Sequence, residues 1–75
     1  MPRDPLVIQE TRAWLSKADE DLSASELCLH ARRPLPASAT YHAQQAAEKS
    51  IKAWLTWNGL AFRKTHHLIE IAEPA

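Results

Sequence analysis

The stretch YHAQQAAEKSIKAW, from Tyr41 to Trp54, decides the fold that this sequence predicts. It consists mostly of good helix formers and contains neither glycine nor proline. The helix extends on both sides, because the nearest breaking signals are Pro36 and the pair Asn58-Gly59. We therefore predict a helix over residues 37–58, with a length of about 30 Å.

The apolar residues of this helix cover about 200° of a helical wheel. That arc is wider than one partner helix needs, so we expect two neighbours. We interpret the opposite polar strip as a solvent-exposed face. The strip consists of His42, Gln45, Lys49, Lys52 and Thr56. Gln44 and Glu48 lie at its border, where burial at an interface would require a hydrogen-bond partner for each.

The residues before this helix predict a second one over residues 6–31, ended by Pro34 and Pro36. Asp21 lies at the margin of its apolar stripe. The stripe consists of Trp14, Leu15, Ala18, Leu22, Ser25, Cys28 and Leu29. A short connection between two long helices predicts an antiparallel hairpin. Thr65 is a plausible N-cap of a short third helix over residues 66–73, and no period-two run predicts a strand.

Length and composition exclude several classes of protein. Seventy-five residues make a single domain, and so small a core usually needs oligomerisation or ideal helix packing. Nine basic and nine acidic residues cancel, so the whole chain is not a polycation steered to nucleic acid. The lone Cys28 suits a reducing compartment. Since we find no signal peptide and no membrane-spanning run, we expect a cytoplasmic protein.

Three stretches of the sequence resemble the HEPN domain family. They are WLSKADEDLSASELCL (14–29), YHAQQAAEKSIKAWL (41–55) and THHLIEI (65–71). The most specific is the aromatic-His-x-Gln-Gln-Ala-x-Glu-Lys pattern of the second stretch. The polar residues that match the family's motifs are Asp21, His42, Gln44, Gln45, Glu48 and Lys49.

The resemblance implies an all-α up-and-down helical bundle that commonly dimerises. HEPN proteins of bacteria and archaea are often encoded beside a minimal nucleotidyltransferase, in a toxin–antitoxin-like pair. Some branches are metal-independent RNases and others are described as nucleotide-binding. Family members usually continue into further helices, so we expect the single domain at residues 1–75 to lack the C-terminal helices of the family.

The RNase branches carry an arginine and a histidine separated by four to six residues. Here only two and three residues separate Arg63 from His66 and His67. These side chains are the right types to hold a phosphate and move a proton, but their spacing is wrong. We therefore expect no catalysis by this chain alone, with Arg63, His66 and His67 as the only candidates.

Positive charge gathers where the third predicted helix begins. A helix N-terminus with nearby cations is a natural site for a phosphate, although a simple N-cap at Thr65 explains the pattern as well and is favoured. The candidates for contact with nucleotide or RNA phosphate are Lys49, Lys52, Arg63, Lys64, Thr65 and His66. Adjacent histidines point about 100° apart on a helix, so we expect no metal, and no cofactor is indicated.

Aromatic and aliphatic side chains are better explained as core or interface anchors than as stacking platforms for bases. The interface candidates are Trp14, Tyr41, Ile51, Trp54, Leu55 and Trp57. We expect a homodimer that acts as an accessory or toxin-type component, with a nucleotidyltransferase partner, and contacts nucleotide or RNA phosphate. The alternatives are a metal-independent endoribonuclease and a purely structural oligomerisation module.

Overall fold

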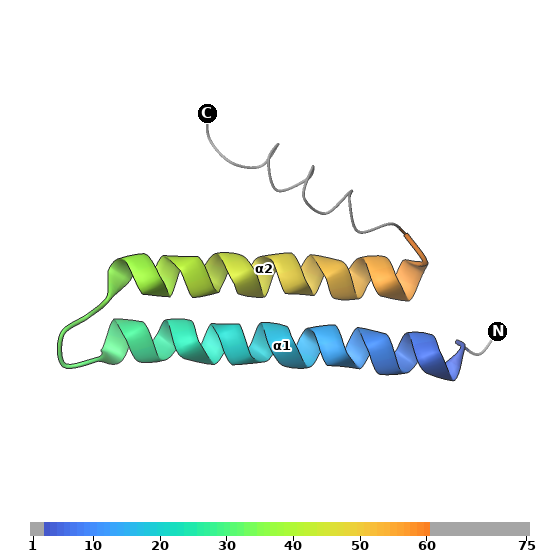
Figure 1. The fold of residues 1–75 in the computed structure, drawn as a ribbon, viewed down its shortest axis with the longest axis horizontal. Helices are drawn as coiled ribbons and strands as arrows, with labels where there is room; N and C mark the ends of the chain where they lie inside the picture. The colour runs from blue at the N-terminus through green and yellow to red at the C-terminus, as the bar shows by residue number, and fades with distance from the viewer. Residues whose placement is uncertain (1–2, 61–75) are drawn as a thin grey trace, which may run out of the picture.

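The computed structural model describes residues 3–60, and they form two long helices packed as an antiparallel hairpin (Figure 1). Helix α1 spans Pro5–His30 and helix α2 spans Pro36–Asn58. The two lie side by side and are joined by the short connection at residues 31–35. The predicted all-α hairpin is therefore confirmed. The third helix predicted over residues 66–73 lies outside the described residues.

Local signals account for where the helices begin. The Asp4 side chain caps α1 by accepting a hydrogen bond from the Leu6 amide at 2.8 Å, and Pro5 occupies the first turn. Helix α2 begins at Pro36, one residue before the predicted start at residue 37. Its N-cap residue is Leu35, and no side chain caps this end.

The ends of the helices also follow from the sequence. After α1, Ala31 is extended, and the Leu35 amide donates to the Cys28 carbonyl at 2.9 Å. Gly59 ends α2 in the left-handed conformation, with φ 69° and ψ 29°. Its amide donates to the last free carbonyls of the helix, as expected of a C-terminal glycine.

The contact between the helices is built from small side chains. Ala39, Ala46 and Ala53 recur every seven residues along α2, and all three are buried. Ala18 is buried on α1, and these four residues form what we call the alanine seam. Ser25 is buried beside the seam and donates its hydroxyl to the Ala39 carbonyl at 2.7 Å. Small residues at a helix contact let the two axes approach closely.

The close approach leaves several large apolar residues at the edges of the contact, whereas Leu55 of α2 is 1% exposed. Leu15 and Leu22 of α1 each keep 50% of their surface exposed, although the sequence placed both in the buried stripe. Trp54 of α2 is also exposed. These side chains belong to one side of the hairpin, which we call the apolar face. It comprises Leu15, Leu22 and Leu29 of α1 and Ala43, Ala47, Ser50, Trp54 and Trp57 of α2.

The interpretation of the polar strip of α2 as a solvent-exposed face is wrong. Thr56 is buried, and the other four members of the strip are half-buried. His42, Lys49 and Thr56 alternate with the seam alanines at spacings of three and four residues, so they face α1. The border residue Gln44, a candidate for burial, is exposed. Glu48, its neighbour one turn on, is half-buried.

Candidate functional site

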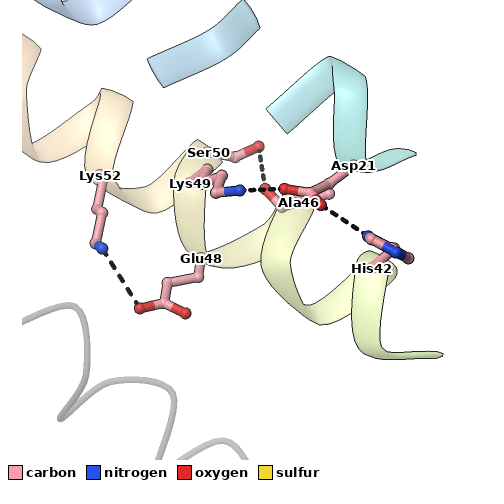
Figure 2. A network of polar contacts seen from close by, with 7 residues as sticks. All are labelled: Asp21, His42, Ala46, Glu48, Lys49, Ser50 and Lys52. Atoms are coloured by element: carbon pink, nitrogen blue, oxygen red, sulfur yellow. Dashed lines mark hydrogen bonds and ion pairs between the residues drawn. The ribbon is translucent and has the colours of Figure 1, made fainter. Parts of the chain in front are cut away.

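A polar cluster bridges the two helices (Figure 2). By helical spacing, it lies on the side of the seam opposite the apolar face. Asp21 projects from α1 and receives two cationic or polar partners from α2. The Nδ1 of His42 lies 2.9 Å from Asp21 Oδ1, and Lys49 Nζ donates to Oδ2. Both carboxylate oxygens are thus used by groups seven residues, or about two turns, apart on α2. The sequence analysis selected Asp21, His42 and Lys49 separately, and the fold brings their side chains into contact.

The environment of Asp21 favours its ionised form. Only 12% of its side chain is exposed, against 32% for His42 and 26% for Lys49. The hydrogen bond from Lys49, followed by that from His42, lowers the pKa of the Asp21 carboxyl below its usual value. Partial burial opposes this shift but does not reverse it. Asp21 is therefore an anion that holds two side chains of α2 in place.

Trp14 extends the same side of the hairpin toward the open end. Its ring lies 4.9 Å from Lys17 Nζ of the same helix and 5.0 Å from Lys52 Nζ of α2. Lys52 also approaches Glu48, with 3.6 Å between Nζ and Oε1. We call this side the polar face. It comprises Trp14, Lys17 and Asp21 of α1 and His42, Glu48, Lys49 and Lys52 of α2.

Sequence reasoning did not select Lys17 as a site residue. The signal for it was present, because Trp14 and Lys17 are three residues apart and therefore neighbours on one helix face. The contact of Lys52 with Trp14 could not be read in the same way. It depends on how α1 and α2 are aligned, which neither helix reveals alone.

The remaining site candidates fall into separate places. Gln45 is half-buried and Gln44 is exposed. The candidates Arg63, Lys64, Thr65, His66 and His67 all lie outside the described residues. The structure thus brings together only the part of the predicted phosphate site that α2 supplies, namely Lys49 and Lys52.

The six interface candidates differ in their exposure. Leu55 is 1% exposed, so its side chain is unavailable to a partner in this arrangement. Trp14 and Ile51 are half-buried. Tyr41, Trp54 and Trp57 are exposed, and the last two lie on the apolar face.

Within residues 3–60, no group of three or more His, Cys, Asp or Glu side chains is arranged to hold a metal ion. Neither of the two described helices is long and apolar enough to cross a membrane. What the polar face offers instead is positive charge next to an aromatic ring. Lys17, Lys49 and Lys52 supply three positive charges, and Asp21 and Glu48 supply two negative ones. The excess of positive charge is suited to an anionic ligand.

Comparison with known proteins places this geometry in a family. The HEPN domain model matches residues 11–75, a range that includes the alanine seam and the Asp21 cluster. A protein of Methanocaldococcus jannaschii, "Putative toxin MJ1304", is 37% identical over 57 residues. These residues are 76% of this chain but 36% of the archaeal relative, so the chain spans about a third of that protein's length.

No solved structure matches this chain. The family model nevertheless covers most of the sequence, from the second turn of α1 through the whole of α2. It also covers the helix pair that carries the Asp21 cluster. The chain belongs to the HEPN domain family.

Proposed function

We propose that this protein is a toxin-type HEPN component that acts with a minimal nucleotidyltransferase and contacts nucleotide or RNA phosphate. The family match and the archaeal relative named as a toxin support the toxin-type role. The relative is much longer than the matched segment, so this role is a proposal about the present chain. The observation that carries the phosphate contact is the approach of Lys17 and Lys52 to the Trp14 ring, with Lys49 one turn from Lys52 on the same face.

The lysines on the polar face are suited to a flexible phosphate chain. Lys17 and Lys52 approach the same Trp14 ring from two helices, and Lys49 lies one turn before Lys52 on α2. Proteins that bind single-stranded nucleic acid commonly combine a basic groove with aromatic rings. Asp21 fixes Lys49 and His42 against the hairpin, so a phosphate would meet positive charge that is already positioned.

Direct titration tests the phosphate contact. The full chain is titrated with ATP, with GTP and with a short single-stranded RNA, and the RNA titration is repeated at several salt concentrations. Lys17→Gln is expected to weaken RNA binding and to reduce the slope of log K against log salt by about 0.7. Arg12→Gln is the matched control, since Arg12 is exposed on α1 away from the polar face. Absence of binding at millimolar ligand, or equal effects of both variants, would reject the phosphate contact.

A separate experiment tests the toxin-type role. The protein is expressed in a bacterial host alone and together with the protein encoded by the neighbouring gene, and growth is followed. Growth arrest that the partner relieves, with co-purification of the two proteins, is the expected result. Unchanged growth without the partner, together with no complex, would contradict the proposal even if RNA binding were observed.

A further inference from the structure

A pocket of about 530 Å³ lies at the open end of the hairpin, where the start of α1 meets the end of α2 (Figure 1). Its walls include Arg3, Asp4 and Val7 from the start of the chain and Thr56 and Trp57 from the last turn of α2. Within residues 3–60, none of the residues that define the polar face lines this pocket. Its volume lies in the range of about 300–1,000 Å³ that is usual for small-molecule sites. The pocket is therefore large enough for a small ligand.

Thr56 contributes a hydroxyl that makes no hydrogen bond in the described hairpin. The residue is 9% exposed, and its Oγ1 has no partner among residues 3–60. Helical threonines often donate this hydroxyl to a carbonyl one turn back, as Thr40 does to the Pro36 carbonyl at 2.9 Å. The Thr56 hydroxyl is buried without such a contact, which lowers stability. Since a helical threonine has two common χ1 rotamers and Thr56 lines the pocket, a ligand there can supply the missing partner.

Arg3 adds a positive charge that is held in place but not neutralised. Its guanidinium lies over the Trp57 ring, with 4.4 Å between Cζ and the ring centroid. No carboxylate pairs with Arg3 among the described residues. An arginine positioned by an aromatic ring can bind a carboxylate with two parallel hydrogen bonds. The pocket therefore has a site for a carboxylate.

Asp4 gives the same pocket a negative charge. Its Oδ1 accepts a hydrogen bond from the Leu6 amide at 2.8 Å, whereas Oδ2 accepts none within residues 3–60. Arg3 and Asp4 are neighbours in the chain, but their side chains do not form an ion pair. A simple anion would meet Arg3 but would also approach Asp4, which is unfavourable. A ligand that carries both signs can meet each charge with its opposite.

We propose that this pocket binds a free α-amino acid with an apolar side chain. The carboxylate of the ligand meets the Arg3 guanidinium, and its ammonium group meets Asp4 Oδ2. The Thr56 hydroxyl donates to a carboxylate oxygen of the ligand. The apolar side chain of the ligand packs against half-buried Val7 and the exposed Trp57 ring. This binding is independent of the phosphate contact on the polar face, because the two sites share no residue.

Calorimetric titration of the full chain with leucine tests the two charged contacts. Leucine is compared with leucinol, which lacks the carboxylate, and with isocaproate, which lacks the ammonium group. Loss of either group should weaken binding by at least about tenfold, because a hydrogen bond to a charged group is lost. Arg3→Gln should reduce the difference in affinity between leucine and leucinol. Asp4→Asn, which keeps a side chain suited to an N-cap, should reduce the difference between leucine and isocaproate. Absence of binding at millimolar leucine, or equal binding of the three ligands, would overturn the proposal.

The two buried hydroxyls without a partner in residues 3–60 provide a matched pair of variants. Thr56→Val should weaken leucine binding by about tenfold, although the hairpin is not expected to lose stability. Thr11→Val removes the other hydroxyl, which lines a groove on the apolar face instead of the pocket, and should leave leucine binding unchanged. Equal weakening by the two variants, or an unchanged affinity in Thr56→Val, would overturn the assignment of the site to this pocket.

Discussion

The Nδ1 of His42 on α2 lies 2.9 Å from the carboxylate of Asp21 on α1, although 21 residues separate the two along the chain. Together with the ion pair from Lys49, this contact sets the alignment of the two helices. A half-buried polar group at a helix contact often specifies register, because a shift by one turn would leave it without a partner. The Asp21 cluster thus has a structural role whether or not it takes part in binding.

Substitution of Asp21 should show this role directly. Asp21→Asn removes the negative charge and leaves Lys49 and His42 half-buried without their counterion, so we expect a lower midpoint of urea unfolding. Asp19→Asn is the matched control, because Asp19 is exposed on the same helix. The decrease in the urea midpoint should be clearly larger for Asp21→Asn than for Asp19→Asn. Equal loss in the two variants would mean that the cluster does not stabilise the hairpin.

The stabilisation from Asp21 should depend on pH in a defined direction. Its pKa in the folded protein is lowered from the usual 3.8, so the unfolded chain takes up a proton first as pH falls. The contribution is complete above about pH 5 and is lost as pH falls below 3.8 and through the lowered value. Urea unfolding of the wild type and of Asp21→Asn at pH 7 to 3 should therefore give curves that converge at low pH. A constant difference between them would contradict this assignment.

Substitution of Thr56 should raise the stability of the hairpin, whereas substitution of Asp21 should lower it. Its hydroxyl is buried and has no hydrogen-bond partner among residues 3–60, a state that costs about 1–3 kcal/mol. Thr56→Val keeps the shape and removes the hydroxyl, so the free energy of unfolding should rise by about 1 kcal/mol.

Thr40→Val is the control for this change on the same helix. The Thr40 hydroxyl is exposed and donates to the Pro36 carbonyl at 2.9 Å, so its removal should be neutral or slightly destabilising. Thermal unfolding of the two variants should shift in different directions. A lower melting temperature for Thr56→Val would show that its hydroxyl has a partner in solution.

The alanine seam should tolerate little increase in volume. Ala53 is 2% exposed at the contact, and Ala53→Leu would force the helices apart, with an expected cost of about 1–3 kcal/mol. Ala13→Leu adds the same side chain at an exposed position of α1 and should change stability by less than about 0.5 kcal/mol. Denaturant unfolding distinguishes the two. If Ala53→Leu left stability unchanged, the seam would be looser than described.

The sequence predicted the hairpin well because its signals are local. Pro36 and Gly59 mark the ends of α2 by the backbone angles they allow, and no tertiary contact is needed to read them. Local signals do not determine which face of α2 packs against α1. The apolar arc of α2 contains alanines and tryptophans, and hydrophobicity favours the tryptophans as the buried part. Close packing favoured the alanines instead, which turned His42 and Lys49 toward α1 and Trp54 toward solvent.

The same difference between signals within one helix and contacts between helices applies to the candidate site. Asp21, His42 and Lys49 were each selected by motif, but their meeting depends on the register between helices. Spacing within one helix carries no information about that register. Lys17 was missed because an exposed lysine on a helix is ordinary until the Trp14 ring and Lys52 are placed around it.

The hydrogen bond from Ser25 to the Ala39 carbonyl also bears on how the chain folds in time. It joins residues 14 apart, whereas the pair of Asp21 and Lys49 joins residues 28 apart. Doubling the length of the closed loop adds about 0.6 kcal/mol to its entropic cost. We therefore expect the hairpin to zip from its connection outward, with the Ser25 contact forming early. Fraying should begin at the other end, where Asp4 and Gly59 cap the two helices.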